Sequence, residues 1–490
     1  MNKKIDIFQK SIIAFLCLII SILLIFLVPI TANDELWNFQ NIYKMFNGLT
    51  IYNDSNVIVT PIFFYIGYII FNFFSANIIF FRIYNLIIYF LLYFIIFKIL
   101  KNLKVCKNLT LLYTIFAFLL TFQVVPSGAN YNTLAILFSL IGLSLYVSKK
   151  SNNLLQGLIA FLVFFTKQNI GIFYIISVLI YELYINKLSK KYIINQIKKL
   201  LFFLIPTCIL LLKLYFDNNI LGFFNYCFGG LLEFGKNNFA FYASSYYLLI
   251  PIITIVLFVI ALYYRNTIFK KFENVFFQNL ALLFIFSVMH TFMIFPIINS
   301  AHLIYTFPFH LIFIFYFFDN LIFSDLFHDN SYKIRINIFG ITILMIILLR
   351  IIANFITDYK YIKFYNTYNS PFNFTFITKE NIEKLDVLKN YIQEKNSKGI
   401  NVIIISYDSA FPMVELNQNH GVYDLLFNGN LGYNGKEKIK EDILNRENTE
   451  FLVVTDKEDL FEQEPPEIRE FIIDNLNFKG KICNYSVYSK

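Results

Sequence analysis

The chain has 490 residues, of which 58% are hydrophobic and 15% are charged, and its mean hydropathy is +0.60. A soluble domain carries roughly a quarter charged residues, so this composition excludes an ordinary soluble protein and indicates an integral membrane protein. The formal net charge is +9, but Lys and Arg occur in short clusters between apolar runs, which is typical of a topology signal. A single basic face is not evident, and we expect no nucleic-acid partner. The five Cys are scattered without a CxxC pair, so neither a zinc site nor a disulfide framework is indicated.

The first apolar run, residues 11–30, follows the basic start MNKK and lacks a small-residue cleavage site. It is typical of an uncleaved signal anchor with a cytoplasmic N-terminus. The run ends outside in TANDELWNFQ, residues 31–40, where Asp34 and Glu35 are adjacent and Trp37 follows. Trp37 fits an interfacial anchor, because Trp is enriched at membrane–water boundaries.

The next apolar stretch, residues 60–74, is short for a crossing, and we predict an interfacial helix in the first external loop. With that choice the positive-inside rule holds for the loops that follow. The other predicted spans are 77–98, 108–125, 131–148, 153–166, 170–186, 200–216, 246–264, 276–297, 303–320 and 336–356, about eleven in all with the first. The shortest is 153–166, and a pair of re-entrant halves around FTKQNIG, residues 165–171, is the alternative.

From residue 357 the chain turns polar, which predicts two domains, a membrane domain over 1–356 and a small extracytoplasmic α/β domain over 357–490. TKENIEKLDVLKNYIQEKN has apolar residues at helical spacing, with Thr378 as its N-cap. NVIIIS and FLVVTD are suited to buried strands, and KEKIKEDIL to a helix between them.

This threading gathers polar residues at the external ends of the spans. They are Asp34, Glu35, Asp54, Arg82, Asn130, Asn132, Lys167, Gln168, Glu233, Lys236 and His302. Each has a structural alternative: an acidic pair at a span end is usually solvated, Arg82 can snorkel to the interface, and Glu233 can pair with Lys236 along a helix turn. Lys167 interrupts an apolar region between two short spans, where a buried ammonium needs an anionic partner.

Four stretches, NDELW, YNTL, FTKQNIGI and INSAHLIYTFP, occur in this order at external span ends. They resemble the GT-C superfamily of integral membrane glycosyltransferases, in the bacterial family-39-like branch related to protein O-mannosyltransferases and aminoarabinose transferases. The resemblance implies that Asp34 is the catalytic base, that Glu35 is the second residue of an Asp-Glu pair, and that Lys167 and Arg82 are cations for a lipid phosphate. The chain departs from the aminoarabinose-type pattern at VIVTP, residues 57–61, which leaves Asp54 as a weak candidate for the second carboxylate.

We therefore expect a glycosyltransferase of the plasma (inner) membrane that moves a sugar from a polyprenyl-phosphate donor to a hydroxyl of a glycan, lipid or protein acceptor at the external face. Asp34 would act as general base, and Lys167, Arg82 and His302 would stabilise the leaving phosphate. The catalytic set is Asp34 and Glu35, and the substrate-binding set is Arg82, Lys167, Gln168, His302, Asp54, Glu233 and Lys236. A divalent cation stays open, because two carboxylates can bind one but no ligand set has diagnostic spacing.

Two other functions fit the composition, namely a transporter or flippase of lipid-linked glycans and a polysaccharide polymerase. A transporter would be expected to carry ionisable residues near mid-bilayer or two similar halves with broken helices, and neither is apparent. The C-terminal domain would hold the acceptor or cap the site. A second catalytic centre at Asp408, His420 and Asp424 is not favoured, because scattered polar residues in such a domain are mostly in turns and on the surface.

Overall fold

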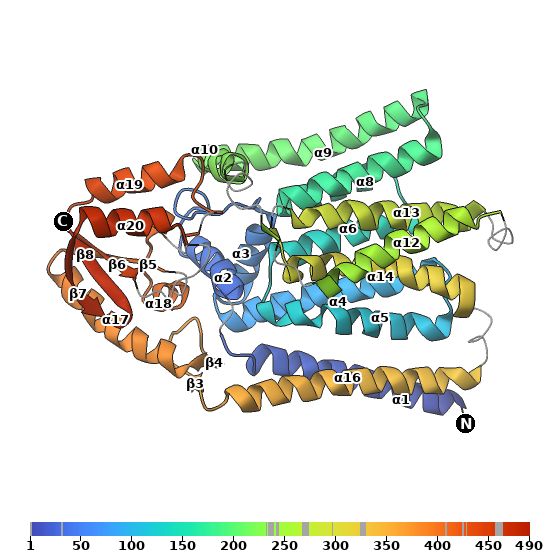
Figure 1. The fold of residues 1–490 in the computed structure, drawn as a ribbon, viewed down its shortest axis with the longest axis horizontal. Coiled ribbons are helices and arrows are strands. Elements are labelled where there is room, and N and C mark those ends of the chain that lie inside the picture. Colours follow the sequence, from blue (N-terminus) through green and yellow to red (C-terminus); the bar gives the residue numbers. More distant parts are fainter. Residues whose placement is uncertain are drawn as a thin grey trace.

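The structure is a computed structural model that describes residues 2–490 apart from 31–32, 232, 234–239, 242–244, 267–273, 296, 324–329, 407–408, 424–425, 428 and 456–463. Long apolar helices form a bundle, and a small sheet with flanking helices lies at one end of it (Figure 1). The chain is thus a helical membrane protein with a small C-terminal α/β region.

Each range predicted as a span coincides with a helix. These helices are α1 Asn2–Phe26, α4 Ile78–Asn102, α5 Lys107–Thr121, α6 Tyr131–Val147, α7 Asn153–Thr166, α8 Gln168–Asn186, α9 Lys190–Phe216, α12 Leu249–Tyr263, α13 Asn274–Thr291, α14 Ser300–Phe318 and α16 Asn330–Asp358. Among the described residues, 7 helices are long and apolar enough to cross a membrane: α4, α8, α9, α13, α14, α16 and α12 with its preceding turn. The apolar parts of α1, α5, α6 and α7 are shorter.

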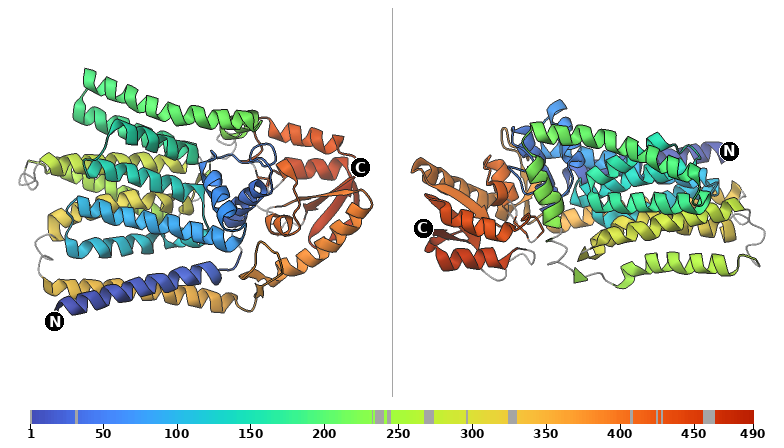
Figure 2. Two further views of the ribbon diagram at one scale, coloured as in Figure 1. Left: turned by 180° about the vertical axis from the view of Figure 1, so that it is seen from behind. Right: turned by 90° about the horizontal axis from the view of Figure 1, so that it is seen from above.

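Successive helices of the bundle run in alternating directions, which Figure 2 shows from two further sides. Several helices begin, at the end nearest the C-terminal region, with an Asn whose side chain accepts a backbone N–H. Asn77 accepts from Ile79, Asn130 from Thr133 and Asn299 from His302. These caps satisfy N–H groups that a helix start leaves without a partner, so the sequence itself determines where the helices begin.

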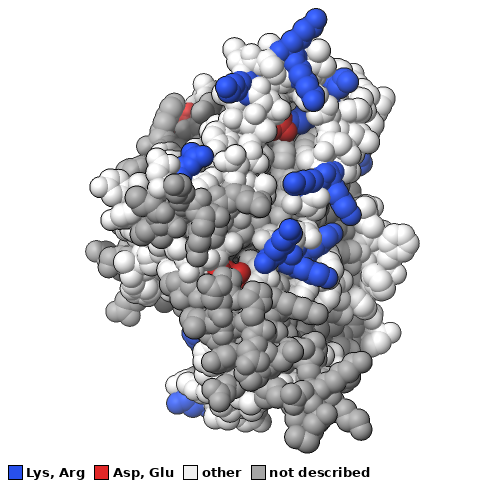
Figure 3. Space-filling view, turned by 90° about the vertical axis from the view of Figure 1, so that its right-hand side faces the viewer, with Lys and Arg blue, Asp and Glu red and all other residues white. Residues whose placement is uncertain are grey.

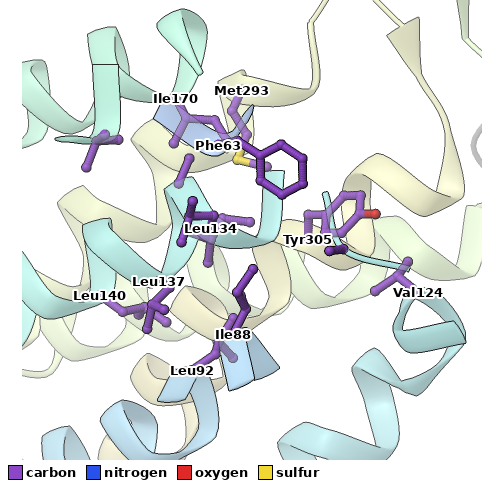
Figure 4. Close-up of a cluster of buried hydrophobic side chains, with 14 of the residues drawn as sticks. Phe63, Ile88, Leu92, Val124, Leu134, Leu137, Leu140, Ile170, Met293 and Tyr305 are labelled. Carbon is purple, nitrogen blue, oxygen red and sulfur yellow. The ribbon is translucent and has the colours of Figure 1, made fainter. Parts of the chain in front are cut away.

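The core of the bundle is built from interlocking aliphatic and aromatic side chains (Figure 4). Phe63 comes from α3 (Ile62–Phe73), and its buried ring lies in one cluster with Ile88 of α4, Leu134 of α6 and Tyr305 of α14. The predicted interfacial segment is therefore a helix, but one whose inner face is buried against the spans.

A second helix, α2 (Asn33–Phe46), occupies the segment that the sequence analysis treated as an external loop. It lies with α3 between the bundle and the C-terminal sheet (Figure 1) and is buried along most of its length. Its start carries the acidic pair Asp34 and Glu35, which is a favourable placement because carboxylates complement the positive end of the helix dipole.

The C-terminal region forms a four-stranded sheet in the order β5-β6-β8-β7, with β5 (Asn401–Ile405) parallel to β6 (Thr449–Val454). The strands β7 (Asn477–Ile482) and β8 (Tyr485–Ser489) are antiparallel to each other, and β8 is antiparallel to β6. Helices α17 (Lys379–Ser397), α18 (Ala410–Glu415), α19 (Gly435–Asn445) and α20 (Pro466–Asn475) flank it. The predicted strands and helices are confirmed, including Thr378, whose hydroxyl accepts from the Asn381 N–H at 3.3 Å.

This region is joined to the bundle by backbone and aromatic contacts. A hairpin of β3 (Ile362–Tyr365) and β4 (Thr375–Thr378) approaches the first span, where the Ile30 N–H donates to the Phe376 carbonyl at 2.8 Å. In its connecting loop, the buried ring of Phe372 lies 5.3 Å from the ring of Phe39 in α2 and 5.0 Å from that of Phe411 in α18. The same core thus extends from the spans through α2 into the C-terminal region.

We expect Phe372→Ala to weaken this junction, because removing a buried aromatic ring costs about 3–5 kcal/mol. The melting temperature of the full-length protein in detergent should fall, and proteolysis within residues 357–375 should become faster. Phe478→Ala, which removes a ring that is 57% exposed, is the control and should change neither. Equal melting temperatures for the two variants would contradict a shared core.

Candidate active site

Asp34 lies in the first turn of α2, and its side chain is exposed. Desolvation by the surrounding protein nevertheless raises the pKa of this carboxyl above its ordinary value, while the nearby charge of Lys167 acts in the opposite direction. The two observations together describe a carboxylate that is accessible yet enclosed by protein on most sides. Such a group can accept a proton from a ligand without first breaking an internal ion pair.

Lys167 lies between α7 and α8, in an extended conformation that interrupts the two helices. Its ammonium donates to the side-chain oxygen of Asn132 in α6 and lies 5.1 Å from the ring centroid of Tyr131. Burial lowers the pKa of Lys167 to about 8, and the charge of Asp34 opposes this shift. The predicted anionic partner of Lys167 is therefore within electrostatic range, and it is Asp34.

Amide side chains hold the helix ends around Lys167. Asn130 caps α6 and also donates to the Tyr305 hydroxyl in α14 at 2.5 Å. Gln168 is buried, and its Nε2 donates to the carbonyls of Ile58 at 2.8 Å and of Cys227 at 3.0 Å. Gln168 thus ties α8 to the segment before α3 and to the π-helical turn Asn225–Gly230.

His302 lies in the first turn of α14 and is close enough to Lys167 to interact with its charge. Its Nδ1 atom is buried and finds no hydrogen-bond partner within the described part of the chain. Lys167 therefore has a carboxylate, Asp34, and an imidazole, His302, within electrostatic range. The three residues come from helix starts that are far apart in sequence.

Glu35 and Arg82 form a buried, bidentate ion pair instead of contributing separately to a ligand site. Arg82 Nε donates to Glu35 Oε1 at 2.7 Å and Nη2 donates to Oε2 at 3.0 Å, while Nη1 donates to the carbonyls of Ile25 and Val28. The Arg82 and Glu35 side chains are 4% and 1% exposed, respectively. The guanidinium that the sequence analysis assigned to a lipid phosphate donates four of its five N–H groups to Glu35 and to carbonyls at and just after the end of α1, and the Glu35 carboxylate is held by Arg82.

Gly128 completes the enclosure of Glu35. It has a φ of +80°, and a Cβ at this position would lie 2.8 Å from the Glu35 Cβ. Both the positive φ and the close approach favour glycine here.

The remaining predicted residues have other surroundings. Asp54 accepts from the Thr50 N–H and the Thr50 hydroxyl, both at 2.7 Å, and its backbone carbonyl accepts from the Lys44 ammonium at 2.9 Å. Glu233 follows the π-helical turn, and Lys236 lies outside the described residues, as does the predicted pair of the two. A group of three or more His, Cys, Asp or Glu side chains suited to a metal ion does not occur among the residues searched, which are the described ones.

Trp37 corrects one expectation from the sequence. It is 4% exposed, and its ring makes edge contacts with Phe64 of α3 at 6.3 Å, Tyr131 of α6 at 6.1 Å and Phe427 of the C-terminal region at 6.4 Å. It is a packing residue between three parts of the protein and does not sit at a lipid boundary. The acidic pair Asp34 and Glu35 could have indicated that a helix starts here, because acidic residues are typical of the first turn of a helix. Trp37 would then have been placed on that helix and not at the end of a span.

Comparisons with protein-family models, with curated proteins and with solved structures found no match.

A double-mutant cycle tests the buried ion pair. Arg82→Met should destabilise the protein by about 3–5 kcal/mol, because it leaves the Glu35 carboxylate buried without its counter-charge. Adding Glu35→Gln should restore part of this loss, since the remaining amide carries no charge. The measurement is the shift of the thermal unfolding midpoint in detergent for both single variants and the double variant. A double variant that loses the sum of the two single losses would show that the pair is not coupled.

Proposed function

We propose that this protein is a membrane glycosyltransferase of the GT-C type, which transfers a sugar from a polyprenyl-phosphate donor to an acceptor hydroxyl of a glycan, lipid or protein. The observation that carries the proposal is the accessible, desolvated carboxylate of Asp34 within electrostatic range of Lys167. A base for the acceptor and a cation for the leaving phosphate are the two groups that this reaction needs.

The proposed membrane arrangement has eleven spans, with the N-terminus cytoplasmic and the C-terminal α/β region extracytoplasmic. It rests on the alternation of the helices and on charge: the end of the bundle opposite the C-terminal region displays many Lys and Arg and few acidic side chains (Figure 3). Lys101, Lys149, Lys187 and Arg265 belong to this end. The positive-inside rule assigns such an end to the cytoplasm, which leaves Asp34 at the external face of the plasma membrane.

In the proposed reaction, Asp34 takes the proton of the acceptor hydroxyl as its oxygen attacks the anomeric carbon of the sugar. The bond between that carbon and the phosphate oxygen breaks, and polyprenyl phosphate leaves with the bonding electrons. Lys167 stabilises the charge that develops on the phosphate, and its contacts with Asn132 and Tyr131 hold it in place. Attack opposite the leaving phosphate inverts the anomeric centre.

Glu35 and Arg82 act in this proposal as positioning residues, because the ion pair that they form fixes the start of α2. Gln168 fixes the start of α8 next to Lys167, and His302 lies within electrostatic range of Lys167. Asp54 stabilises the turn after α2 through its hydrogen bond with Thr50. No step runs through a metal ion, since Glu35 and Asp54 are engaged by Arg82 and Thr50.

Asp34→Asn tests the base. It keeps the shape of the side chain but cannot take a proton, so transfer from a polyprenyl-phosphate sugar to the acceptor should fall by about 10²- to 10⁴-fold. Asp386→Asn, at an exposed carboxylate of α17, is the matched control and should keep the wild-type rate. A wild-type rate for Asp34→Asn would overturn the mechanism, and movement of the lipid-linked sugar across the membrane without its consumption would favour a flippase instead.

The pH profile tests the cation. Asp34 must be ionised and Lys167 protonated, so the transfer rate should rise through the raised pKa of Asp34 and fall again near pH 8, where Lys167 loses its proton. Lys167→Met should lower the rate and remove the alkaline limb, because methionine does not titrate. The readout is kcat/KM across the acidic and alkaline limbs of the profile, and an unchanged alkaline limb in Lys167→Met would assign that limb to another group.

A further inference from the structure

A polar pocket lies where the C-terminal region meets the segment between α2 and α3. Its volume is about 340 Å³, at the small end of the range of about 300–1,000 Å³ for small-molecule sites. Asn53 lines it from the α2–α3 segment, Asn401 from the start of β5, and Asp442 and Arg446 from the end of α19. Asp34 is in the first turn of α2, whereas Asn53 follows the end of that helix, so the pocket is separate from the candidate active site.

The guanidinium of Arg446, which directly follows α19, is held in place by two neighbouring side chains. Its Nε donates to Asp442 Oδ2 at 2.7 Å, and its Cζ lies 5.2 Å from the ring centroid of the buried Tyr423. The Tyr423 hydroxyl donates to the same carboxylate oxygen, so the three side chains form one assembly. An Arg side chain fixed in this way loses less conformational freedom when it binds a ligand.

This assembly presents both hydrogen-bond donors and an acceptor to the pocket. Of the five N–H groups of Arg446, one goes to Asp442 and the nearby Tyr423 hydroxyl can accept another, which leaves three for a ligand. Asp442 binds both side chains through Oδ2, and its Oδ1 has no hydrogen bond to a described residue. The Arg446 and Asp442 side chains are 35% and 41% exposed and line the pocket, so a ligand can reach them.

Amide side chains add further donors and acceptors around this ion pair. Asn53 donates to the Asn218 carbonyl at 3.0 Å, which leaves its side-chain oxygen as an acceptor. Asn419 accepts from the Gly421 N–H at 3.1 Å, which leaves its Nδ2 as a donor. Asn53, Asn419 and Asn401 are all exposed and line the pocket. The pocket therefore offers open groups of both kinds, and the charges of its ion pair cancel.

The pocket does not offer a free sheet edge to a peptide. β5 is an edge strand of the four-stranded sheet, and Asn401 and Ile403 of this strand line the pocket. An added strand would need the backbone groups along this edge, but the Ile404 N–H already donates to Nδ1 of the buried His420 at 3.2 Å. His420 thus has a structural role, and the pocket favours a small ligand over an extended peptide.

We propose that this pocket binds a neutral sugar unit of hexose size. A hydroxyl group both donates and accepts hydrogen bonds, so adjacent hydroxyls on a ring match a surface with open donors and acceptors. One hydroxyl donates to Asp442 Oδ1, a neighbouring hydroxyl accepts from Arg446, and others reach the Asn amides. An anionic ligand would meet the Asp442 carboxylate, and an apolar ligand would leave these polar groups without partners. The site does not depend on the transferase proposal, because binding requires no lipid-linked donor.

The test is a titration followed by saturation-transfer NMR on the full-length protein in lipid nanodiscs, since detergents with sugar headgroups would compete for the pocket. The probes are glucose, galactose, mannose and N-acetylglucosamine, with glucuronate as the anionic comparison. We expect at least one neutral probe to bind with a Kd of about 1 mM, the range for a ligand of so few atoms. Failure of all four neutral probes to bind, or binding of glucuronate alone, would overturn the proposal.

A matched pair of Arg variants tests the assembly on α19. Arg446→Gln should weaken the binding of that sugar by about 10- to 100-fold, because a hydrogen bond to a charged group is lost. The protein should still fold, since a partly exposed ion pair contributes little to stability. Arg469→Gln, on α20 and outside the pocket, is the control and should bind the sugar as the wild type does. Equal affinity in the two variants would overturn the proposal.

A second pair of variants tests the pocket without touching the ion pair. Asn401 and Asn477 are the first residues of β5 and β7, the two edge strands of the sheet, and both are exposed. Asn401→Trp fills the pocket and should abolish sugar binding, whereas Asn477→Trp at the opposite edge should leave it unchanged. Equal sugar binding by the two Trp variants would place the sugar elsewhere on the protein and overturn the proposal.

Discussion

The buried ion pair of Glu35 with Arg82 is the constraint on which the candidate site depends. Arg82 holds Glu35 with two N–H groups and the end of α1 with two more bonds, so one guanidinium joins α1, α2 and α4. Neighbouring residues of a helix point in directions about 100° apart. Anchoring Glu35 on α4 therefore turns Asp34 to a different side, where Lys167 lies within electrostatic range.

The two adjacent carboxylates thus have different environments and different chemistry. The Glu35 side chain is 1% exposed and is paired with the Arg82 guanidinium, so its role is structural. The Asp34 side chain is exposed, but the surrounding protein desolvates its carboxylate. It interacts with the Lys167 charge without an ion-pair contact. The division follows a general pattern in which two carboxyl groups in one site are separated in function by their environments.

Composition and periodicity predicted most of the fold, because apolar runs of sufficient length must become buried helices or spans. The helix α17 and its cap at Thr378, and the strands β5 and β6, followed in the same way from local patterns. The helix α2 did not, since its sequence NDELWNFQNIYKMF mixes polar with apolar residues and much of its burial comes from the C-terminal region, hundreds of residues away in the chain. The pairing of Glu35 with Arg82 was also missed, because sequence position predicts that both lie at the same end of the spans but gives no distance between them.

The packing of Trp37 also changes the view of the C-terminal region. Its ring contacts Tyr131, whose own ring lies beside the Lys167 ammonium, and on another edge it contacts Phe427 of the C-terminal region. A displacement of Phe427 would therefore shift Trp37 and Tyr131, and Tyr131 contacts the Lys167 ammonium. Close-packed interiors transmit such shifts, because the rings have few alternative positions. The C-terminal region is thus a wall of the candidate site, and a shift of Phe427 can alter the position of Lys167 without direct contact between the two.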